Sequence, residues 1–451
     1  MYSYIPHTEQ ETRAMLDAIG VKSLEDLFSD VKEAGCLLER PLDIEKGRSE
    51  EQTLDIIRGL AALNIKGVSF LGAGSYDHVI PSAVKSLSSL PAFSTAYTPY
   101  QPEISQGVLE AIFEYQSLIC ELTGMDVSNA SLYDGASAAA EAASLAIADK
   151  RKSSRVVLSG TMHPFAIQCV KTWALGTGRE VVVLPEKNGV NDYSSLESLL
   201  DDSAAAFIAQ SPNRYGYLED FTGVADLVHS RKCLFAISSD PLSLAMQKSQ
   251  AEWGADIAFG DTQVLGIPMG FGGPYCGYMA VRQDLMRKIP GRIVGQTVDT
   301  EGRRAFVLTL QAREQHIKRE RATSNICSNE ALCSLTNVIY ASLLGWEGLK
   351  EASSQSYSKA HYLAAGLKEL GYCAGAGLAP FWCEFPVVFK SPEKLEEFTE
   401  EMKRNGIFSG VKLSRITLDR KDDSTLLVAV TEKRTREQLD RYLAIAKREA
   451  R

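Results

Sequence analysis

The sequence predicts an α/β fold, with a large domain built on a mostly parallel sheet and a small C-terminal α+β domain. Short apolar or β-branched runs alternate with helical patterns from residue 155 to residue 238. Such alternation is typical of βαβ units, in which helices cover both faces of a parallel sheet. From about residue 330, helical patterns with two strand-like runs between them form a second block. We therefore expect a helical arm over 1–50, the large domain over 51–325 and the small domain over 326–451.

The elements of the large domain can be assigned in order. The strand-like runs are RVVLS, EVVVLP, AAFIAQ and CLFAIS, and the helical patterns between them are PFAIQCVKTWAL, SSLESLL and TGVADLVHSRK. The stretch from Asp256 to Gly277 is expected to add a buried strand, a turn at Gly260 and Asp261, and a glycine cluster that leads into another strand. Segment 308–325, LTLQAREQHIKRERATSN, is expected to form a charged helix with a solvated or interface face.

Composition limits the class of protein. The chain has 451 residues, of which 45% are hydrophobic and 23% charged, and its net charge is -9. A nucleic-acid-binding protein would show a basic excess, so this charge argues against that class. The nine cysteines contain no C-x-x-C pair, which favours free thiols in a reducing compartment and no metal site. The N-terminus lacks the pattern of a signal peptide and no apolar run reaches 18 residues, so we expect a cytoplasmic protein without a membrane span.

Polar residues gather where the predicted strands end. His163, Asn213 and Asp240 each follow one of these runs. Ligands of open α/β sheets bind beyond the carboxyl ends of the strands, so these three residues are candidates for a binding site. The alternative is structural: polar side chains at strand ends also satisfy backbone groups.

The run SLYDGAS, residues 131–137, joins a turn to a helix rich in small residues. Small residues let backbone amides approach an anion, and the helix dipole favours negative charge at that end. Asp134, Gly135 and Ser137 are therefore candidates for a phosphate-binding turn. Close packing of an alanine-rich helix explains the pattern almost as well.

The segment from Tyr97 to Gln106 is rich in aromatic residues and proline. Its prolines exclude a helix, whereas residues 106–122 have apolar residues at helical spacing. One interpretation is a packed loop. The other is a rim that reaches an active site in this chain or in a partner, with Tyr97, Tyr100, Gln101 and Glu103 as the candidate residues.

Four runs together resemble the P-protein of the glycine cleavage system, and within that family the amino-terminal-half chain, subunit 1, of its two-chain form. They are YTPYQPEISQG, SLYDGASAAAEAA, IPMGFGGPYCGYMA and REQHIKRERATSNICSN. The resemblance implies a fold-type-I pyridoxal-phosphate-dependent transferase-like architecture. It also implies glycine decarboxylation together with subunit 2, transfer of the aminomethyl group to the lipoyl group of the H-protein, and a heterodimer or a dimer of heterodimers. In this family fold, an aspartate at the position of Asp240 contacts the pyridine nitrogen.

The chain lacks the lysine that such an enzyme needs. The cofactor-bearing half of the family has a His-Lys pair just before its IP-and-glycine run, and the matching residue here is Gln263. An amide nitrogen cannot form an imine, so Gln263 should not hold the cofactor covalently. Other lysines, Lys171, Lys248, Lys288 and Lys318, do not follow a strand end with a glycine turn behind it.

We therefore expect a subunit whose pyridoxal phosphate lies on the partner, with Asp134, Gly135, Ser137, His163, Asn213 and Asp240 as remnants of a cofactor site. An alternative is a non-catalytic scaffold that docks the acidic lipoyl carrier protein through the segment from Arg313 to Arg321. Gln263 argues against a pyridoxal decarboxylase that acts without a partner subunit, because its amide cannot form the imine with the cofactor.

Overall fold

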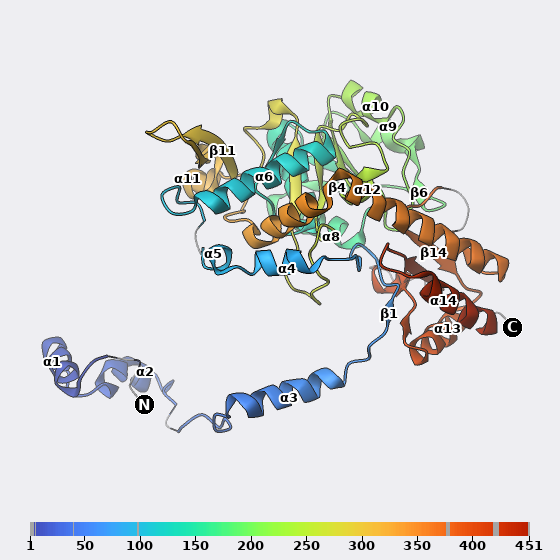
Figure 1. Ribbon diagram of the computed structural model, residues 1–451. Coiled ribbons are helices and arrows are strands. Elements are labelled where there is room, and N and C mark those ends of the chain that lie inside the picture. The colour runs from blue at the N-terminus through green and yellow to red at the C-terminus, as the bar shows by residue number, and fades with distance from the viewer. Residues whose placement is uncertain are drawn as a thin grey trace. The chain divides into compact units, whose positions relative to one another are not determined.

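The structure is a computed structural model that describes residues 4, 6–38, 40–96, 99–375, 379–417 and 424–449 (Figure 1). It divides into two compact units, residues 1–65 and 66–451. The first unit consists of short helices: α1 (Glu9–Ile19), η1 (Glu25–Phe28), α2 (Ser29–Glu33) and α3 (Glu50–Ala62). Capping boxes at Thr8 and Ser49 start α1 and α3. Among the described residues of this unit, no side chain is buried.

The second unit is built on a seven-stranded sheet with the strand order β2-β10-β9-β8-β7-β3-β4. Neighbouring strands from β9 to β4 pair in parallel, whereas β10 is antiparallel to both β9 and β2. The predicted fold class, α/β with a mostly parallel sheet, is thus confirmed. In sheet order the strands are Val127–Ser128, Gly277–Val281, Ile257–Asp261, Leu234–Ser238, Ala204–Gln210, Arg155–Ser159 and Glu180–Leu184.

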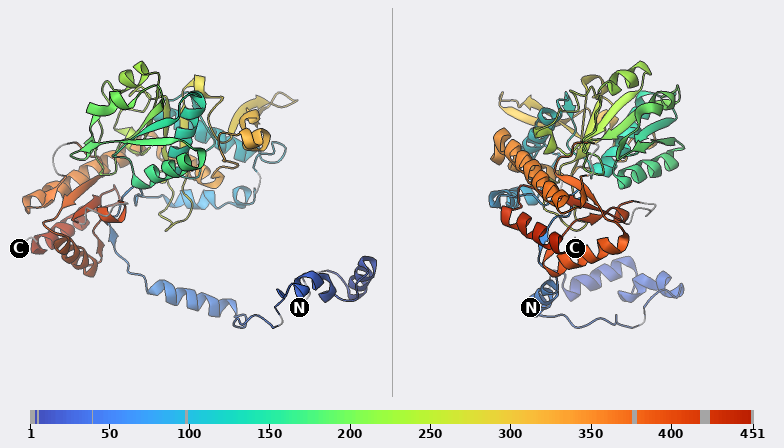
Figure 2. Two further views of the ribbon diagram at one scale, coloured as in Figure 1. Left: turned by 180° about the vertical axis from the view of Figure 1, so that it is seen from behind. Right: turned by 90° about the vertical axis from the view of Figure 1, so that its right-hand side faces the viewer.

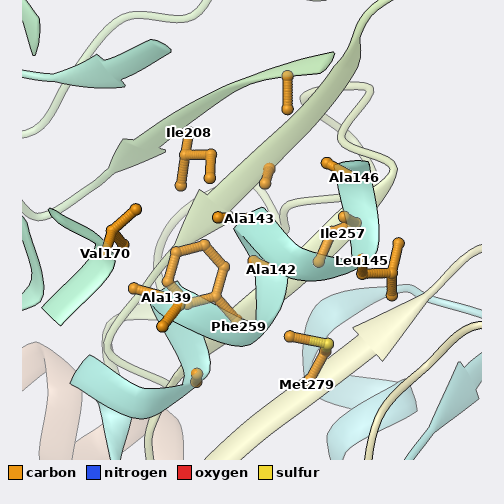
Figure 3. Packing of buried hydrophobic residues seen from close by; sticks show 14 of the residues in the cluster. Ala139, Ala142, Ala143, Leu145, Ala146, Val170, Ile208, Ile257, Phe259 and Met279 are labelled. Atoms are coloured by element: carbon orange, nitrogen blue, oxygen red, sulfur yellow. The ribbon is translucent and has the colours of Figure 1, made fainter. Parts of the chain in front are cut away.

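Helices cover both faces of this sheet. On one face lie α7 (Gly135–Asp149) and α8 (Pro164–Thr177), and on the other lie α6 (Gln106–Thr123), α9 (Leu196–Leu199) and α10 (Val224–Ser230). Figure 3 shows alanines of α7 next to Phe259 and Met279 of the sheet. Because alanine has no side chain beyond Cβ, α7 approaches the strands closely, and ten of its fifteen residues are buried. Packing of the alanine-rich helix is therefore part of the reason for the SLYDGASAAAEAA pattern.

The C-terminal block contains a four-stranded antiparallel sheet, β13-β14-β17-β16. Its helices α13 and α14 lie side by side (Figure 2) and pack against this sheet and the second half of α12. A kink at Gly345, with φ of 64°, divides α12. The elements are α12 (Ala331–Glu369), β13 (Cys373–Ala374), β14 (Glu384–Val388), α13 (Pro392–Arg404), β16 (Val411–Lys412), β17 (Thr425–Ala429) and α14 (Arg436–Glu449).

The remaining elements are short and lie in the second unit. Strand β1 (Val68–Ser69) pairs in parallel with β15 (Ile407–Phe408), and β5 (Glu186–Lys187) forms a hairpin with β6 (Val190–Asn191). Two short helices, α4 (Ser82–Ser88) and α5 (Pro91–Ser94), precede α6. Single 3-10 turns are η2 (Tyr193–Ser195), η3 (Ser243–Ala245), η4 (Gln283–Leu285) and η7 (Leu413–Arg415).

The charged helix expected over 308–325 is wrong. Strand β12 (Arg304–Thr309) pairs with β11 (Ile293–Val298), and short turns follow it: η5 (Gln311–Arg313), α11 (Gln315–Lys318) and η6 (Arg319–Arg321). Leu310 and Arg319 have positive φ values of 53° and 54°, which a continuous right-handed helix does not allow. Residues 308 and 309 belong to a hairpin formed with the preceding strand β11, and the positive φ values at Leu310 and Arg319 interrupt the helical pattern after it.

No helix in the described part of the chain combines the length and apolar character needed to cross a membrane.

Candidate functional site

A cavity of about 370 Å³ lies at the carboxyl ends of the parallel strands. The ends of β7, β8 and β9, the first residues of α7 and α8, and a loop over residues 73–76 form its walls, with Trp382 and Ile416 from the C-terminal block. Its position agrees with the rule for open α/β sheets. Of the residues predicted from sequence, it brings together Asp134, Gly135, His163, Asp240 and Gln263.

Gln263 is held by hydrogen bonds at both ends of its side-chain amide. Its Oε1 accepts from the backbone N–H of Tyr76 at 2.9 Å, and its Nε2 donates to the carbonyl oxygens of Tyr76 at 3.0 Å and Ile267 at 2.8 Å. The residue is only 3% exposed. Gln263 therefore ties the loop over residues 73–76 to the turn that follows β9, and its amide is a structural group.

Two carboxylates occupy the N-terminus of α7. Asp134 caps the helix by accepting the N–H of Ser137 at 2.7 Å. Asp261, at the end of β9, accepts the N–H of Gly135 at 3.0 Å and the N–H of Gln263 at 2.8 Å. Burial raises the pKa of Asp261 to about 7, although these two backbone donors act in the opposite direction. The helix end that sequence reasoning assigned to a phosphate thus already contacts acidic side chains of the chain itself.

Asp240 is engaged in its own turn. One of its oxygens accepts from the N–H of Leu242 at 2.8 Å and the N–H of Ser243 at 3.3 Å. Burial raises the pKa of this carboxyl to about 6. Its position on the cavity wall still leaves it near any ligand that enters from the strand ends.

His163 begins α8 and has a structural role. Its Nδ1 accepts from the N–H of Phe165 at 3.2 Å, so its Nε2 carries the proton and donates to the carbonyl oxygen of Ala73 at 3.2 Å. Burial lowers the pKa of this imidazole, which favours its neutral form. The ring therefore orients the loop over residues 73–76 and brings no positive charge to the cavity.

Two of the six residues expected to be remnants of a cofactor site, Asn213 and Ser137, do not line the cavity. Asn213 is 3% exposed and holds the turn after β7, accepting from the N–H groups of Tyr215 and Tyr217 and donating to Gly189 and Glu219. Ser137 is the third residue of α7, and its contribution is the N–H that Asp134 caps. The contacts of Asn213 therefore agree with the structural alternative, in which a polar side chain at a strand end forms hydrogen bonds with backbone groups.

Sequence reasoning missed Asp261, Tyr76 and Glu384. Glu384 comes from β14 in the C-terminal block and accepts the N–H of Ala73 at 2.6 Å and the hydroxyl of Tyr76 at 3.0 Å. Burial raises the pKa of Glu384 to about 7. The sequence signal for Asp261 was its place at the end of a buried strand, whereas Tyr76 and Glu384 have none because their contacts join distant segments.

The aromatic loop lies apart from the cavity. Tyr97 is outside the described residues. The Tyr100 hydroxyl contacts Ser328 Oγ at 2.7 Å and donates to Asn329 Oδ1 at 2.6 Å, and its ring lies 4.3 Å from the guanidinium carbon of Arg292. Gln101 and Glu103 are exposed. Tyr100 therefore anchors the loop on its own chain and leaves these two polar side chains at the surface.

Comparison with known proteins decides the family. The sequence profile described as "Glycine cleavage system P-protein" matches residues 2–446. The chain belongs to the glycine cleavage system P-protein family. It is 48% identical over 445 residues to the probable glycine dehydrogenase (decarboxylating) subunit 1 of Carboxydothermus hydrogenoformans, an alignment that covers 98% of both chains.

Solved structures agree with this P-protein family assignment. A crystal structure of glycine decarboxylase (P-protein) of the glycine cleavage system, in inhibitor-bound form, superposes with a TM-score of 0.89 at 38% identity, covering 99% of this chain and 100% of that chain. An alanine–glyoxylate aminotransferase from Nostoc sp. has a TM-score of 0.59 at 14% identity over 93% of this chain and 99% of its own. The architecture is that of fold-type-I pyridoxal-phosphate-dependent enzymes.

The P-protein fold implies pyridoxal phosphate, but the residues of this cavity do not fit it. The described residues that line the cavity include no lysine or arginine, and the carboxyl groups of Asp134 and Asp261 lie at the helix end where the phosphate would bind. A phosphate needs the free N–H groups of the helix N-terminus. The N–H of Gly135 already donates to Asp261 and the N–H of Ser137 to Asp134. The negative charge of these carboxyl groups would repel a phosphate placed at the same helix end. No step of the family reaction is therefore assigned to a cofactor in this cavity.

Proposed function

We propose that the chain is the non-cofactor-anchoring subunit of a glycine decarboxylase of the glycine cleavage system. With subunit 2 it decarboxylates glycine and passes the aminomethyl group to the lipoyl group of the H-protein. In this proposal pyridoxal phosphate resides on subunit 2, and this chain has an enzymatic role only as one part of a hetero-oligomer. The observation that carries the proposal is the side-chain amide of Gln263, which makes three hydrogen bonds within the chain. We infer from the sequence motif that this residue matches the Schiff-base lysine of the cofactor-bearing half, and an amide cannot form an imine.

Two further features support this division of labour. First, the described residues that line the cavity include the carboxyl groups of Asp134, Asp240 and Asp261 and no lysine or arginine to receive the phosphate. Second, Gln263 and Glu384 both form hydrogen bonds with the loop over residues 73–76, so this wall of the cavity is fixed by contacts within the chain. A subunit of this kind offers its partner a rigid surface, and rigid surfaces lose less conformational entropy on association.

The test uses the two subunits alone and together. Glycine-dependent exchange of labelled carbon dioxide is measured with this chain, with subunit 2 and with the mixture, in the presence of H-protein and pyridoxal phosphate. We expect exchange only in the mixture, and no borohydride-reducible absorbance band in this chain alone. A reducible internal aldimine in the isolated chain would overturn the proposal.

The aromatic loop is proposed as the part that reaches the shared active site. Tyr100→Phe removes the hydroxyl that bonds to Ser328 and Asn329, and we expect lower turnover of the reconstituted complex without release of subunit 2. Glu103→Gln and Gln101→Ala change exposed side chains and separate a contact with the partner from loss of loop anchoring. Unchanged turnover in all three variants would count against a role for the loop.

The scaffold alternative is favoured by one observation. Lys318, Arg319 and Arg321 are exposed on the segment that follows β12, and such a surface would attract an acidic carrier. Charge reversal at Arg319 and Arg321 tests the scaffold alternative. It requires that the variant bind the H-protein more weakly, while the exchange of labelled carbon dioxide measured without the H-protein is retained. Unchanged carrier affinity would exclude docking at this segment.

A further inference from the structure

A second cavity, of about 530 Å³, lies at the other ends of α7 and α8. Its walls are the last two turns of α7, the end of α8 with Trp173 and Thr177, residues 287–291, and residues 313–326. None of its described lining residues lines the candidate site, which is formed by the first turns of the same two helices. This cavity, here called the basic cavity, is thus a separate feature of the fold.

Positive charge dominates the basic cavity. Its lining contains one carboxylate, Glu314, which is paired with Arg292 at 2.7 Å. Against it stand seven cationic side chains: Arg151, Arg179, Arg287, Lys288, Arg313, Lys318 and Arg321. The whole chain carries a net charge of -9, so composition does not explain this concentration of cations.

Most of these cations have no strong counter-charge. Lys288 pairs with Asp149, and Arg321 has only a 3.8 Å contact with the exposed Glu320. Within the described residues, Arg151, Arg287 and Lys318 form no ion pair, although they come from three different segments. Like charges held close together without counter-ions repel one another, and an anion between them would remove that repulsion.

Arg313 adds a partly buried charge to this group. Its Nη1 donates to the carbonyl oxygens of Ile289 and Gly291, which fixes the guanidinium against the wall formed by residues 287–291. Its Nε and Nη2 are buried without an acceptor. Burial lowers the pKa of this guanidinium, and the nearby Glu314 compensates only in part. A cation withdrawn from water in this way is stabilised by an anion nearby.

We propose that the basic cavity binds a small anion with two or more negative charges, of phosphate or carboxylate chemistry. The volume lies within the range of about 300–1,000 Å³ that is usual for small-molecule sites. Cations from four segments converge on it, so an anion with several charges contacts more of them than a monovalent ion does. The cavity is concave and partly closed, which fits a small anion better than the flat face of a carrier protein.

The test is calorimetric titration of the full-length chain with pyrophosphate, citrate and acetate at matched ionic strength. We expect saturable binding of pyrophosphate or citrate, with acetate at least about tenfold weaker. The stronger of the two multivalent anions identifies phosphate or carboxylate as the natural chemistry. The double variant R151Q/R287Q should weaken the favoured anion by about tenfold or more.

A matched control separates the cavity from net charge. The variant R415Q/R448Q removes two exposed cations that do not line the basic cavity, and it should leave the affinity within about twofold. Circular dichroism confirms that both double variants are folded. The proposal is overturned if multivalent anions bind no more tightly than acetate, or if the two double variants lose affinity equally. The proposal is also overturned if R151Q/R287Q weakens binding of the H-protein but leaves the binding of all three small anions unchanged.

Discussion

Replacement of Gln263 by leucine should destabilise the chain through loss of hydrogen bonds, with little change in packing volume. The side-chain amide takes part in three hydrogen bonds, two with the backbone of Tyr76 and one with the carbonyl oxygen of Ile267. A net contribution of about 1 kcal/mol for each bond gives a loss of about 3 kcal/mol. The partly buried N–H of Tyr76 would also lose its acceptor, which adds to this loss.

The assay is urea unfolding, followed by tryptophan fluorescence because Trp382 lines the same cavity. Gln168 provides the control, since its side chain is exposed on α8 and Gln168→Leu should change the free energy of unfolding by less than about 0.5 kcal/mol. If Gln263→Leu unfolds at the same urea concentration as the native chain, the inference that Gln263 ties the loop to the turn is refuted.

Three other predictions concern the same region. Burial raises the pKa of Asp261 to about 7, above its unfolded value of about 3.9, so the protonated carboxyl stabilises the fold at low pH and this contribution is lost as the pH rises toward 7. Between pH 5 and pH 7 the free energy of urea unfolding of Asp261→Asn should therefore fall by about 2 kcal/mol less than that of the native chain. An equal fall in both proteins would contradict the raised pKa. Gly277→Ala should lower the free energy of unfolding by about 1–3 kcal/mol, because the new Cβ would lie 2.4 Å from the carbonyl oxygen of Asp134. The control Gly107→Ala adds a Cβ in open space on α6 and should raise the free energy of unfolding by about 0.5–1 kcal/mol in the same assay. Gln263→Lys should form no borohydride-reducible aldimine with pyridoxal phosphate, because Asp134 and Asp261 still hold the helix N-terminus; a reducible band would show that the lysine alone was missing.

Much of the fold follows from local pattern. Alternation of strand-like and helical runs predicted the parallel sheet, because a sheet buried on both faces needs continuous apolar strands. The run SLYDGAS was expected to join a turn to a helix rich in small residues, and α7 begins within it, at Gly135. The helix expected over 308–325 was wrong, since its charge pattern showed neither that residues 308 and 309 end a hairpin strand nor that Leu310 and Arg319 have positive φ values.

Residue type alone rules out an imine at position 263, because the nitrogen of a glutamine amide is not a nucleophile. The groups that bind the N-terminus of α7 and the loop over residues 73–76 follow from the tertiary structure alone. Asp261 reaches the N–H of Gly135 across 126 residues of chain, and Gln263 meets the backbone of Tyr76 across 187. Contacts of this kind arise from how the sheet brings strand ends together, and no local pattern around either residue specifies them.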